Sequence, residues 1–532
     1  MTAERIFLST AIPYVNSRPH LGHALELVQA DVLARHLRQA GDQVRFQTGT
    51  DDNALKNVLA ADAEQISVTE LTDRNATAFE QLRGPLALSY DDFIRTSSDP
   101  RHRAGVEKLW RACAASGDFD RRRYEGLYCV GCEQFYRSEE LPGGRCPEHG
   151  TEPQQVAEEN WFFRLSRYAD RLRELISSGR LRIEPAARRH EVLSFIAAGL
   201  EDFSVSRPSA RARGWGISVP GDPDQVIYVW WDALGNYITA PGYGTDPAAY
   251  QRWWAGAGRR VHVIGKGVLR FHAVYWPAIL LSAGEPLPTE ILVHDYLTIE
   301  GQKISKSAAG HATAADPVAL TGRYGADAVR WWLVREVPRS GDADFSAARL
   351  IGRADDELAN GIGNLISRVV SLVHRYRGGR VPQPGVRPGD SPGQEPARPH
   401  VLLPGEATAL LAACRDAPAQ VSAALDRFDF RAATAAVWAI AEQANRYIEQ
   451  AEPWHLARAE QAGDKAAGRR LDAVLAVLVA ACRQLGTQLA PFVPDLAGQI
   501  TAACDDAAGP LPASRPLFPR IETEAVVTGR RG

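Results

Sequence analysis

The chain has 532 residues, of which 45% are hydrophobic and 23% are charged. These fractions are ordinary for a globular protein and exclude a wholly disordered or fibrous chain. The length exceeds the ~250–300 residues that one hydrophobic core supports, so we expect several domains, and the net charge of -3 excludes a global basic field that would recruit nucleic acid.

The N-terminal region has the pattern of a strand, a loop and a helix. Residues 5–10 (RIFLST) are strand-like, and residues 19–41 carry apolar side chains at helical spacing between a proline and a glycine. A second strand at 44–48 and a helix from about residue 54 complete a β–α–β unit, which predicts a parallel sheet. Because no signal-like leader and no run of about 18 apolar residues occurs, we expect a cytoplasmic protein without a membrane span.

The middle of the chain interrupts this pattern. Gly, Cys and Pro accumulate over 124–150, and strands of parallel type are predicted again at 226–230 (VIYVW), 261–264 and 291–294. We interpret the interruption as an insertion into a split nucleotide-binding domain. From Arg353 onward the pattern is helical, with a Pro/Gly-rich loop at 378–399 between helices.

Polar or small residues follow the predicted strands. They stand at 11–23, 50–52, 231–232 and 265–267. In an open parallel sheet, ligands bind outside the carboxyl ends of the strands, so these segments should converge on one crevice.

Three of the seven cysteines form a cluster with a histidine. Cys129-x2-Cys132-x13-Cys146-x2-His149 has the donor set of a tetrahedral zinc site, and four protein ligands leave no open position, so the metal would be structural. Glu148 is a poorer candidate ligand. The alternative, a thiol cluster without metal, fits the two matched pairs less well.

Two short motifs are suited to phosphate chemistry. His20-Leu-Gly-His23 begins a helix, whose N-terminus favours anions, although two surface histidines at a helix start are an equal alternative. Only six of the 61 basic residues are lysines, and two of these stand together in Lys303-Ile-Ser-Lys306-Ser. Two ammonium groups on one loop are suited to clamping a triphosphate. The loop lacks the Walker A pattern.

Together, in this order, the two motifs resemble the signature sequences of class I aminoacyl-tRNA synthetases, and most closely those of the methionyl-tRNA synthetase family. The similarity extends from about residue 5 to about residue 500. The segments that carry it are AIPYVNSRPHLGHA, YVWWDALGNYI, VIGKGVLRFHAVYWPAIL, HDYLTIEGQKISKS and RYGADAVRWWL.

The resemblance implies an α/β fold, in which a split Rossmann-type parallel-sheet catalytic domain with a zinc-containing insertion precedes an all-α anticodon-binding domain. The expected domains are a first catalytic half (1–115), the insertion (116–224), a second catalytic half (225–295), a KMSKS-type loop and stem-contact region (296–352), the helical anticodon-binding domain (353–525) and a disordered tail (526–532).

The resemblance also assigns roles to residues. The catalytic residues would be His20, His23, Lys303 and Lys306, and the ATP-binding residues would be these four with Gly22 and Ser305. The methionine pocket would be lined by Ala11, Ile12, Tyr14, Trp230, Leu234, Tyr237, Val268 and His272, with Asp51 receiving the ammonium group. Asn364, Arg368 and Trp454 would read the anticodon. Ordinary core packing is the alternative for Trp230, Tyr237, His272 and Trp454.

The implied activity is that of a ligase which activates methionine with Mg²⁺-ATP and esterifies the 3′ end of tRNA(Met). The implied cofactors are ATP, Mg²⁺ and one structural Zn²⁺ per chain. The partners would be methionine and tRNA(Met), without DNA or membrane, and we expect a monomer.

The sequence departs from the family at several positions. Asp51-Asp52-Asn53 stands where many members have Asp-Glu-His-Gly, Gly267 replaces a common Asp, Ser218 replaces a Pro, and the link after Ser307 is longer. Two alternatives follow. One is a paralogous, tRNA-independent amino-acid-activating ligase of natural-product biosynthesis, which the presence of Asn364, Arg368 and Trp454 disfavours. The other is a non-enzymatic RNA-binding protein, which the intact lysine pair disfavours.

Overall fold

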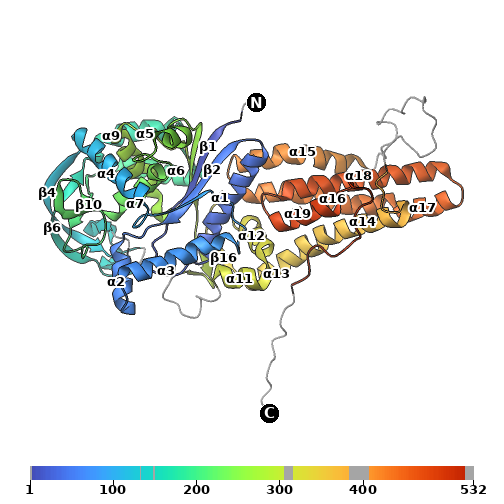
Figure 1. The fold of residues 1–532 in the computed structure, drawn as a ribbon, viewed down its shortest axis with the longest axis horizontal. Coiled ribbons are helices and arrows are strands. Elements are labelled where there is room, and N and C mark those ends of the chain that lie inside the picture. Colours follow the sequence, from blue (N-terminus) through green and yellow to red (C-terminus); the bar gives the residue numbers. More distant parts are fainter. Residues whose placement is uncertain (1–2, 132–133, 148–149, 305–314, 383–406, 522–532) are drawn as a thin grey trace, which may run out of the picture. The chain divides into compact units, whose positions relative to one another are not determined.

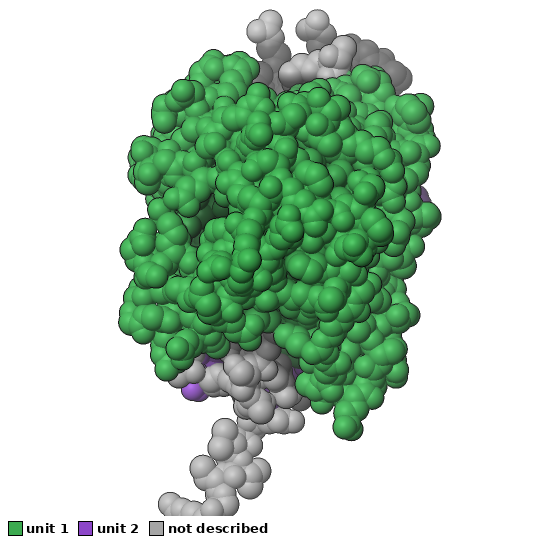
Figure 2. Space-filling model, turned by 90° about the vertical axis from the view of Figure 1, so that its left-hand side faces the viewer, with its two compact units in different colours: residues 1–297, 303–317 green, residues 298–302, 318–532 purple. Residues whose placement is uncertain are grey.

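The computed structural model describes residues 3–131, 134–147, 150–304, 315–382 and 407–521. The chain divides into two compact units (Figure 1). The first contains residues 1–297 and 303–317, and the second contains residues 298–302 and 318–532. One face of the first unit is shown in green in Figure 2.

A six-stranded sheet is the centre of the first unit. Its order is β3-β2-β1-β12-β13-β7, and each neighbouring pair is parallel. The strands are β1 (Arg5–Thr10), β2 (Gln43–Thr50), β3 (Asp92–Arg95), β7 (Arg182–Glu184), β12 (Arg259–Gly265) and β13 (Glu290–His294). The predicted parallel sheet is therefore confirmed. Strand order reverses on either side of β1, which makes the end of β1 a topological switch point.

Helices pack against this sheet. Helix α1 packs on β1, β2 and β12, and α4 packs on α7 and α9. The helices of the first unit are α1 (Leu21–Gln39), α2 (Leu55–Glu64), α3 (Val68–Glu80), α4 (Pro100–Ala115), α5 (Ala169–Ser177), α6 (Ala186–Ala197), α7 (Val229–Thr239), α8 (Pro247–Tyr250) and α9 (Trp276–Ala283). The buried core between the helices and the sheet includes Phe7, Trp231, Trp254 and Trp276, so it is rich in aromatic residues.

One predicted element of the sheet is wrong. Residues 226–230 were expected to form a parallel strand, but β11 (Asp222–Ile227) ends early and pairs antiparallel with β9 (Ser206–Pro208) and β10 (Ser218–Val219) in a separate sheet. Helix α7 begins at Val229, and nearly all of its side chains are buried. A helix buried on all sides loses its amphipathic period, so this apolar run resembled a strand.

The insertion is built on an antiparallel sheet of order β5-β4-β6-β8. Its strands are β4 (Phe119–Cys129), β5 (Gln134–Tyr136), β6 (Gln154–Phe163) and β8 (Phe203–Ser204). Strand β7 comes from within the predicted insertion range yet joins the edge of the parallel sheet beside β13.

The second unit is mainly helical, as the pattern beyond Arg353 predicted. Its helices are α11 (Pro317–Tyr324), α12 (Ala326–Arg335), α13 (Ala347–Arg353), α14 (Asn364–Arg377), α15 (Thr408–Leu425), α16 (Phe430–Ala451), α17 (Pro453–Gln461), α18 (Lys465–Leu489) and α19 (Pro494–Ala503). Short strands β14 (Leu297–Ile299), β15 (Gln302–Lys303) and β16 (Ala343–Phe345) form a further sheet. Most of the predicted loop at 378–399 and all of the predicted tail at 526–532 lie outside the described residues.

Long apolar helices that would cross a membrane are absent from the part of the chain that the structure describes.

Candidate functional site

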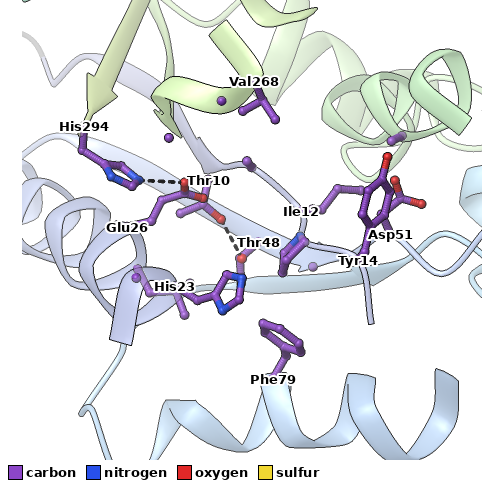
Figure 3. Close-up of a pocket in the computed structure, with 18 of the residues that line it drawn as sticks. Thr10, Ile12, Tyr14, His23, Glu26, Thr48, Asp51, Phe79, Val268 and His294 are labelled. Atoms are coloured by element: carbon purple, nitrogen blue, oxygen red, sulfur yellow. Dashed lines mark hydrogen bonds and ion pairs between the residues drawn. The ribbon is translucent and has the colours of Figure 1, made fainter. Parts of the chain in front are cut away.

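A cavity of about 300 Å³ opens at the carboxyl ends of the central strands. The strands contribute lining residues near their carboxyl ends: Thr10 of β1, Thr48 and Gly49 of β2, Gly265 of β12 and His294 of β13. This is the crevice that the strand ends predicted, and all of its walls belong to the first unit. Figure 3 shows Tyr14 and Asp51 together at one end of the cavity, and Glu26 and His294 together at the other.

The nine residues predicted to bind methionine all line this cavity. Tyr14 lies in the loop after β1, and its ring centroid is 5.8 Å from that of Trp230 on α7. Trp230 in turn stacks on Phe271, with ring centroids 3.7 Å apart. The correction to residues 226–230 therefore places Trp230 in the first turn of a helix, but it still reaches the cavity.

Tyr237 and His272 form a hydrogen-bonded pair in the cavity wall. His272 Nδ1 lies 2.9 Å from the carbonyl of Val268, to which it donates, so Nε2 accepts from the Tyr237 hydroxyl at 2.6 Å. Burial lowers the pKa of His272 to about 4. The imidazole is therefore neutral near pH 7, and this wall offers a thioether polarisable rings without a charge.

Asp51 places a buried carboxylate beside Tyr14 (Figure 3). Its side chain is 1% exposed, and its backbone N–H donates to the carbonyl of Pro13 at 2.9 Å. The Asn57 side chain donates to the carbonyls of Asp51 and Asp52. This loop is thus held by its backbone, and it carries a buried carboxylate, which is a group that can pair with an ammonium.

His20 and His23 lie at the N-terminus of α1, and both line the cavity. The Nδ1 atom of His20 accepts from the Gly22 N–H, and that of His23 accepts from the His20 N–H, each at 3.1 Å. The two rings stack with centroids 3.8 Å apart. Because each Nδ1 is an acceptor, each neutral ring carries its proton on Nε2, which is the atom available to donate to a ligand.

Glu26 and His294 were not predicted. Glu26 stands one turn after Gly22 on α1, and its carboxylate lies 3.0 Å from His294 Nε2 (Figure 3). Burial raises the pKa of Glu26, against the opposing effect of His294. Burial also works against protonation of His294, but the hydrogen bond and charge of Glu26 raise its pKa overall. The i+4 spacing from Gly22 was the available signal for Glu26, whereas His294 is 268 residues away.

The lysine motif is described only in part. Lys303 ends β15, Ile304 lines the cavity, and Ser305 and Lys306 lie outside the described residues. The predicted clamp therefore stays a prediction.

Cys129 and Cys146, the two described members of the predicted zinc set, lie in one small cluster with Tyr136 and Leu141. Both are 1% exposed. The chain turns sharply at Cys146, whose carbonyl accepts from the Gly150 N–H at 2.8 Å. Cys132, Glu148 and His149 lie outside the described residues. Two buried thiols in one cluster are donors that fit a thiolate-rich structural metal site.

Asp52 and Asn53, two of the departures from the family, are not among the residues that line the cavity. Asp52 pairs with Arg95 at 3.0 Å and accepts from Ser97 at 2.7 Å. Asn53 donates to Asp232 at 2.6 Å, and Asp232 lies 2.5 Å from His102. These two residues belong to a polar network outside the cavity wall.

Asn364, Arg368 and Trp454, called the anticodon patch below, lie in the second unit. Asn364 and Arg368 stand one turn apart on α14, and Trp454 is in the first turn of α17. The Arg368 guanidinium carbon lies 5.8 Å from the centroid of the Trp454 ring and pairs with Glu449 at 2.7 Å. Trp454 is half-buried and Asn364 is exposed. The predicted trio is therefore brought onto one face, and its RNA role stays a prediction.

Two family models match the chain. The model described as tRNA synthetases class I (M) matches residues 6–158 and 144–370. The model described as the anticodon binding domain of methionyl tRNA ligase matches residues 402–516. Together they extend over both units.

Individual proteins match over nearly the full length. The methionine–tRNA ligase of Brucella melitensis is 39% identical, with 98% of each chain covered. That of Mycobacterium tuberculosis is 39% identical over 93% of this chain and 91% of its own. The solved structure of Mycobacterium tuberculosis methionyl-tRNA synthetase in complex with methionyl-adenylate superimposes with a TM-score of 0.87 at 37% identity, covering 97% of this chain and 100% of the other.

Proposed function

The chain belongs to the methionyl-tRNA synthetase family of class I synthetases, and from this premise we propose how its residues divide the work of a methionine–tRNA ligase. The reaction uses ATP to make methionyl-adenylate and then esterifies tRNA(Met). A methionine carboxylate oxygen forms a bond to the α-phosphorus while the bond to pyrophosphate breaks. A hydroxyl of the terminal adenosine then displaces AMP from the carbonyl carbon.

The end of the cavity with Tyr14 and Asp51 receives methionine. Trp230, Tyr237 and His272 surround the thioether with buried rings, and Asp51 pairs with the ammonium group. The ammonium charge of the substrate is buried together with its partner, Asp51. The slot for the substrate side chain is neutral and polarisable, so it favours an amino acid with an uncharged side chain over one with a charged side chain. The carboxylate of the substrate then points along the cavity toward His20 and His23.

The end with His20 and His23 receives the nucleotide. No protein nucleophile takes part, so the chain contributes positioning and the stabilisation of charge on the phosphates. The Nε2–H groups of the two histidines donate to phosphate oxygens at a helix N-terminus, where anions are favoured. Lys303 and Lys306 complete the charge stabilisation, with Ser305 and Gly22 contacting ATP, and ATP enters as its Mg²⁺ complex.

A structural Zn²⁺ is held by Cys129, Cys132, Cys146 and His149. Bound there, the metal would cross-link the turns of the insertion without an open coordination position. The purified protein should contain about one zinc per chain, as one four-ligand site requires. Metal analysis of the Cys129→Ser, Cys132→Ser double variant checks this, and full zinc retention would overturn the assignment.

The anticodon patch reads tRNA(Met), with Asn364 and Arg368 contacting base edges and Trp454 stacking on a base. A tRNA-independent ligase is not favoured, because the chain matches an anticodon-binding model over residues 402–516. We also propose a monomer that acts in the cytoplasm. Light scattering after size-exclusion chromatography tests the monomer, and a dimer at micromolar concentration would contradict it.

The observation that carries this proposal is the convergence of nine predicted methionine residues and three predicted nucleotide residues on one cavity. The test is ATP–pyrophosphate exchange with each of the twenty amino acids in turn. Methionine alone should support rapid exchange. Exchange with another amino acid at equal or greater efficiency would contradict the assignment of the pocket.

A further inference from the structure

The last described segment of the chain, residues 510–521, runs along helix α14 and is called the strap below (Figure 1). The Leu511 N–H donates to the carbonyl of Gly379, just after α14, at 2.8 Å. The Ser367 hydroxyl, on α14, donates to the carbonyl of Arg515 at 2.9 Å. Residue numbers rise along the strap while those of its partners fall, so the strap is antiparallel to the helix.

The strap is stiff and carries positive charge. Four of its twelve residues are proline, which favours one extended conformation, and its charged side chains are Arg515 and Arg520. Both arginines are exposed. Arg520 donates from Nε and Nη2 to the side-chain oxygen of Asn360, at 3.1 and 2.8 Å. Within the described residues neither arginine has a carboxylate partner, so the strap presents two uncompensated cations to solvent.

The strap borders the face of α14 that carries the anticodon patch. Its contacts fall at Gly363, Ser367 and His374, which share one stripe of the helix because spacings of four and seven residues return to the same side. Asn364 and Arg368 each follow a strap contact by one residue, so they lie on the neighbouring stripe, turned by about 100°. The strap is therefore one edge of the face.

Helices α16 and α17 form the opposite edge of this face. Arg368 pairs with Glu449 of α16 at 2.7 Å, and its guanidinium carbon lies 5.8 Å from the centroid of the Trp454 ring on α17. The residues between the two edges are polar and exposed: Asn360, Asn364, Ser371 and Arg375. The patch is therefore an open polar strip with an aromatic ring on one edge and cations on the other.

This arrangement suits an unpaired stretch of nucleic acid. Proteins that bind single strands combine aromatic rings, on which bases stack, with cations that follow the phosphate backbone. An arginine is well matched to the second role, because its planar fork can donate two hydrogen bonds to one phosphate. The edge with Trp454 therefore fits bases, and the edge with the strap fits phosphates.

We propose that the strap is part of the tRNA-binding surface and that Arg515 and Arg520 bind phosphates of the anticodon stem-loop. The inference rests on the proposed function, because it takes tRNA(Met) as the ligand of the anticodon patch. The strap adds affinity without sequence information, since every nucleotide carries the same phosphate.

The first test removes the charges. Arg515→Gln and Arg520→Gln should each raise the Kd for tRNA(Met) about 3- to 10-fold at low salt, which is the value of one hydrogen-bonded contact. The slope of log Kd against log salt concentration should fall by about one for each arginine removed. Arg515→Lys keeps the charge and should keep the slope. ATP–pyrophosphate exchange should not change in any variant. Arg415→Gln, which removes an exposed arginine of α15 that is paired with Asp416, is the matched control.

The second test asks whether the contact is to phosphate or to a base. Two transcripts are compared, tRNA(Met) and one with a changed anticodon. Arg515→Gln should weaken the binding of both by the same factor, because a phosphate carries no sequence. Trp454→Ala should instead reduce the preference for tRNA(Met). Melting temperatures show whether each variant is folded.

The outcomes separate the two proposals. Equal binding of the two transcripts by wild type would defeat anticodon reading by the patch, and with it the proposed function. A wild type that prefers tRNA(Met), with strap variants that keep its affinity and salt slope, defeats the inference alone. The inference is also overturned if Arg515→Lys binds as weakly as Arg515→Gln and both have lowered melting temperatures, because the strap would then only support the packing of α14.

Discussion

The cavity of the first unit and the anticodon patch of the second hold their polar groups in different ways. In the cavity, Tyr237 and His272 are bonded to each other at 1% and 3% exposure. In the patch, Arg368 is paired with Glu449, whose side chain is 62% exposed. Buried partners fix one geometry before a ligand arrives, whereas a surface pair contributes little and exchanges readily for a new partner. The first arrangement suits the small substrate that we propose for the cavity, and the second suits the flexible RNA loop that we propose for the patch.

The largest expected effect comes from the transition-state contacts that we propose for the cavity. His23→Ala should lower the rate of adenylate formation about 100- to 1000-fold, because it removes a donor to the developing phosphate charge. His36→Ala, near the end of the same helix, is the control and should stay within about twofold of wild type. Rapid-quench measurement of adenylate checks this, and a normal rate in His23→Ala would place the charge stabilisation elsewhere.

Acid should weaken the first unit through His272. Its pKa is about 4 in the folded chain against an ordinary 6.5. Below pH 6.5 the unfolded chain binds a proton that the folded chain does not, so stability is lost as the pH falls from 6.5 to 4, by up to about 3 kcal/mol. His272→Gln should therefore show a smaller fall in the free energy of unfolding over this range. Equal pH slopes in urea titrations of wild type and variant would contradict the buried neutral imidazole.

The second unit should respond in the opposite direction through Asp327. This buried carboxyl accepts from the Leu496 N–H at 2.6 Å. Burial raises its pKa from 3.8 to about 6. Between pH 6 and 3.8 the folded chain binds the extra proton, so stability is gained on acidification, by up to about 3 kcal/mol. Asp327→Asn should remove this gain and steepen the loss of stability in acid. If the free energy of unfolding of Asp327→Asn fell less steeply on acidification than that of wild type, the sign of the effect would be reversed and the assignment would be refuted.

Changes in the patch should leave activation intact. Trp454→Ala should lower the efficiency of tRNA(Met) charging about 5- to 150-fold, which is the value of one base stacked on a ring, with ATP–pyrophosphate exchange nearly unchanged. His455→Ala, the exposed neighbour, is the control. If the melting temperature, the exchange rate and the charging efficiency all fell together, Trp454 would only support the packing of α17.

The smallest effect concerns the contact between the Tyr14 end of the cavity and the insertion. Lys56 donates to the carbonyl of Gly131 at 2.9 Å and lies 5.7 Å from the centroid of the Tyr14 ring. Lys56→Met should raise the KM for methionine about threefold, from the loss of one hydrogen bond and one weak cation–π contact. Lys108 makes the same two kinds of contact, a hydrogen bond to a backbone carbonyl and a cation–π contact, both with Tyr243 and away from the cavity. Lys108→Met is therefore the matched control. Equal kinetics in the two variants would remove Lys56 from the methionine end.

Local patterns predicted the parts of the fold whose signal lies within a short segment. The buried strand Arg5–Thr10 and the helix behind His20 follow from residue spacing alone, and so does the grouping of Cys129 with Cys146. Residues 226–230 were mistaken for a strand, because a short apolar run does not distinguish a strand from a helix buried on all sides. The Glu26–His294 contact is set by the packing of a helix against a strand, which no local pattern encodes.

The separate roles proposed for the cavity and the patch are tested most directly by a charging assay at fixed salt concentration. The assay compares a transcript of tRNA(Met) with one that is identical except for its anticodon. Salt must be constant, because phosphate contacts depend on it. If the cavity activates methionine and the patch reads the anticodon, the first transcript should be charged efficiently and the second should lose charging, while exchange is the same in both reactions. Equal charging of the two transcripts would contradict anticodon reading by the patch, and activation of methionine without charging of either would contradict the ligase itself.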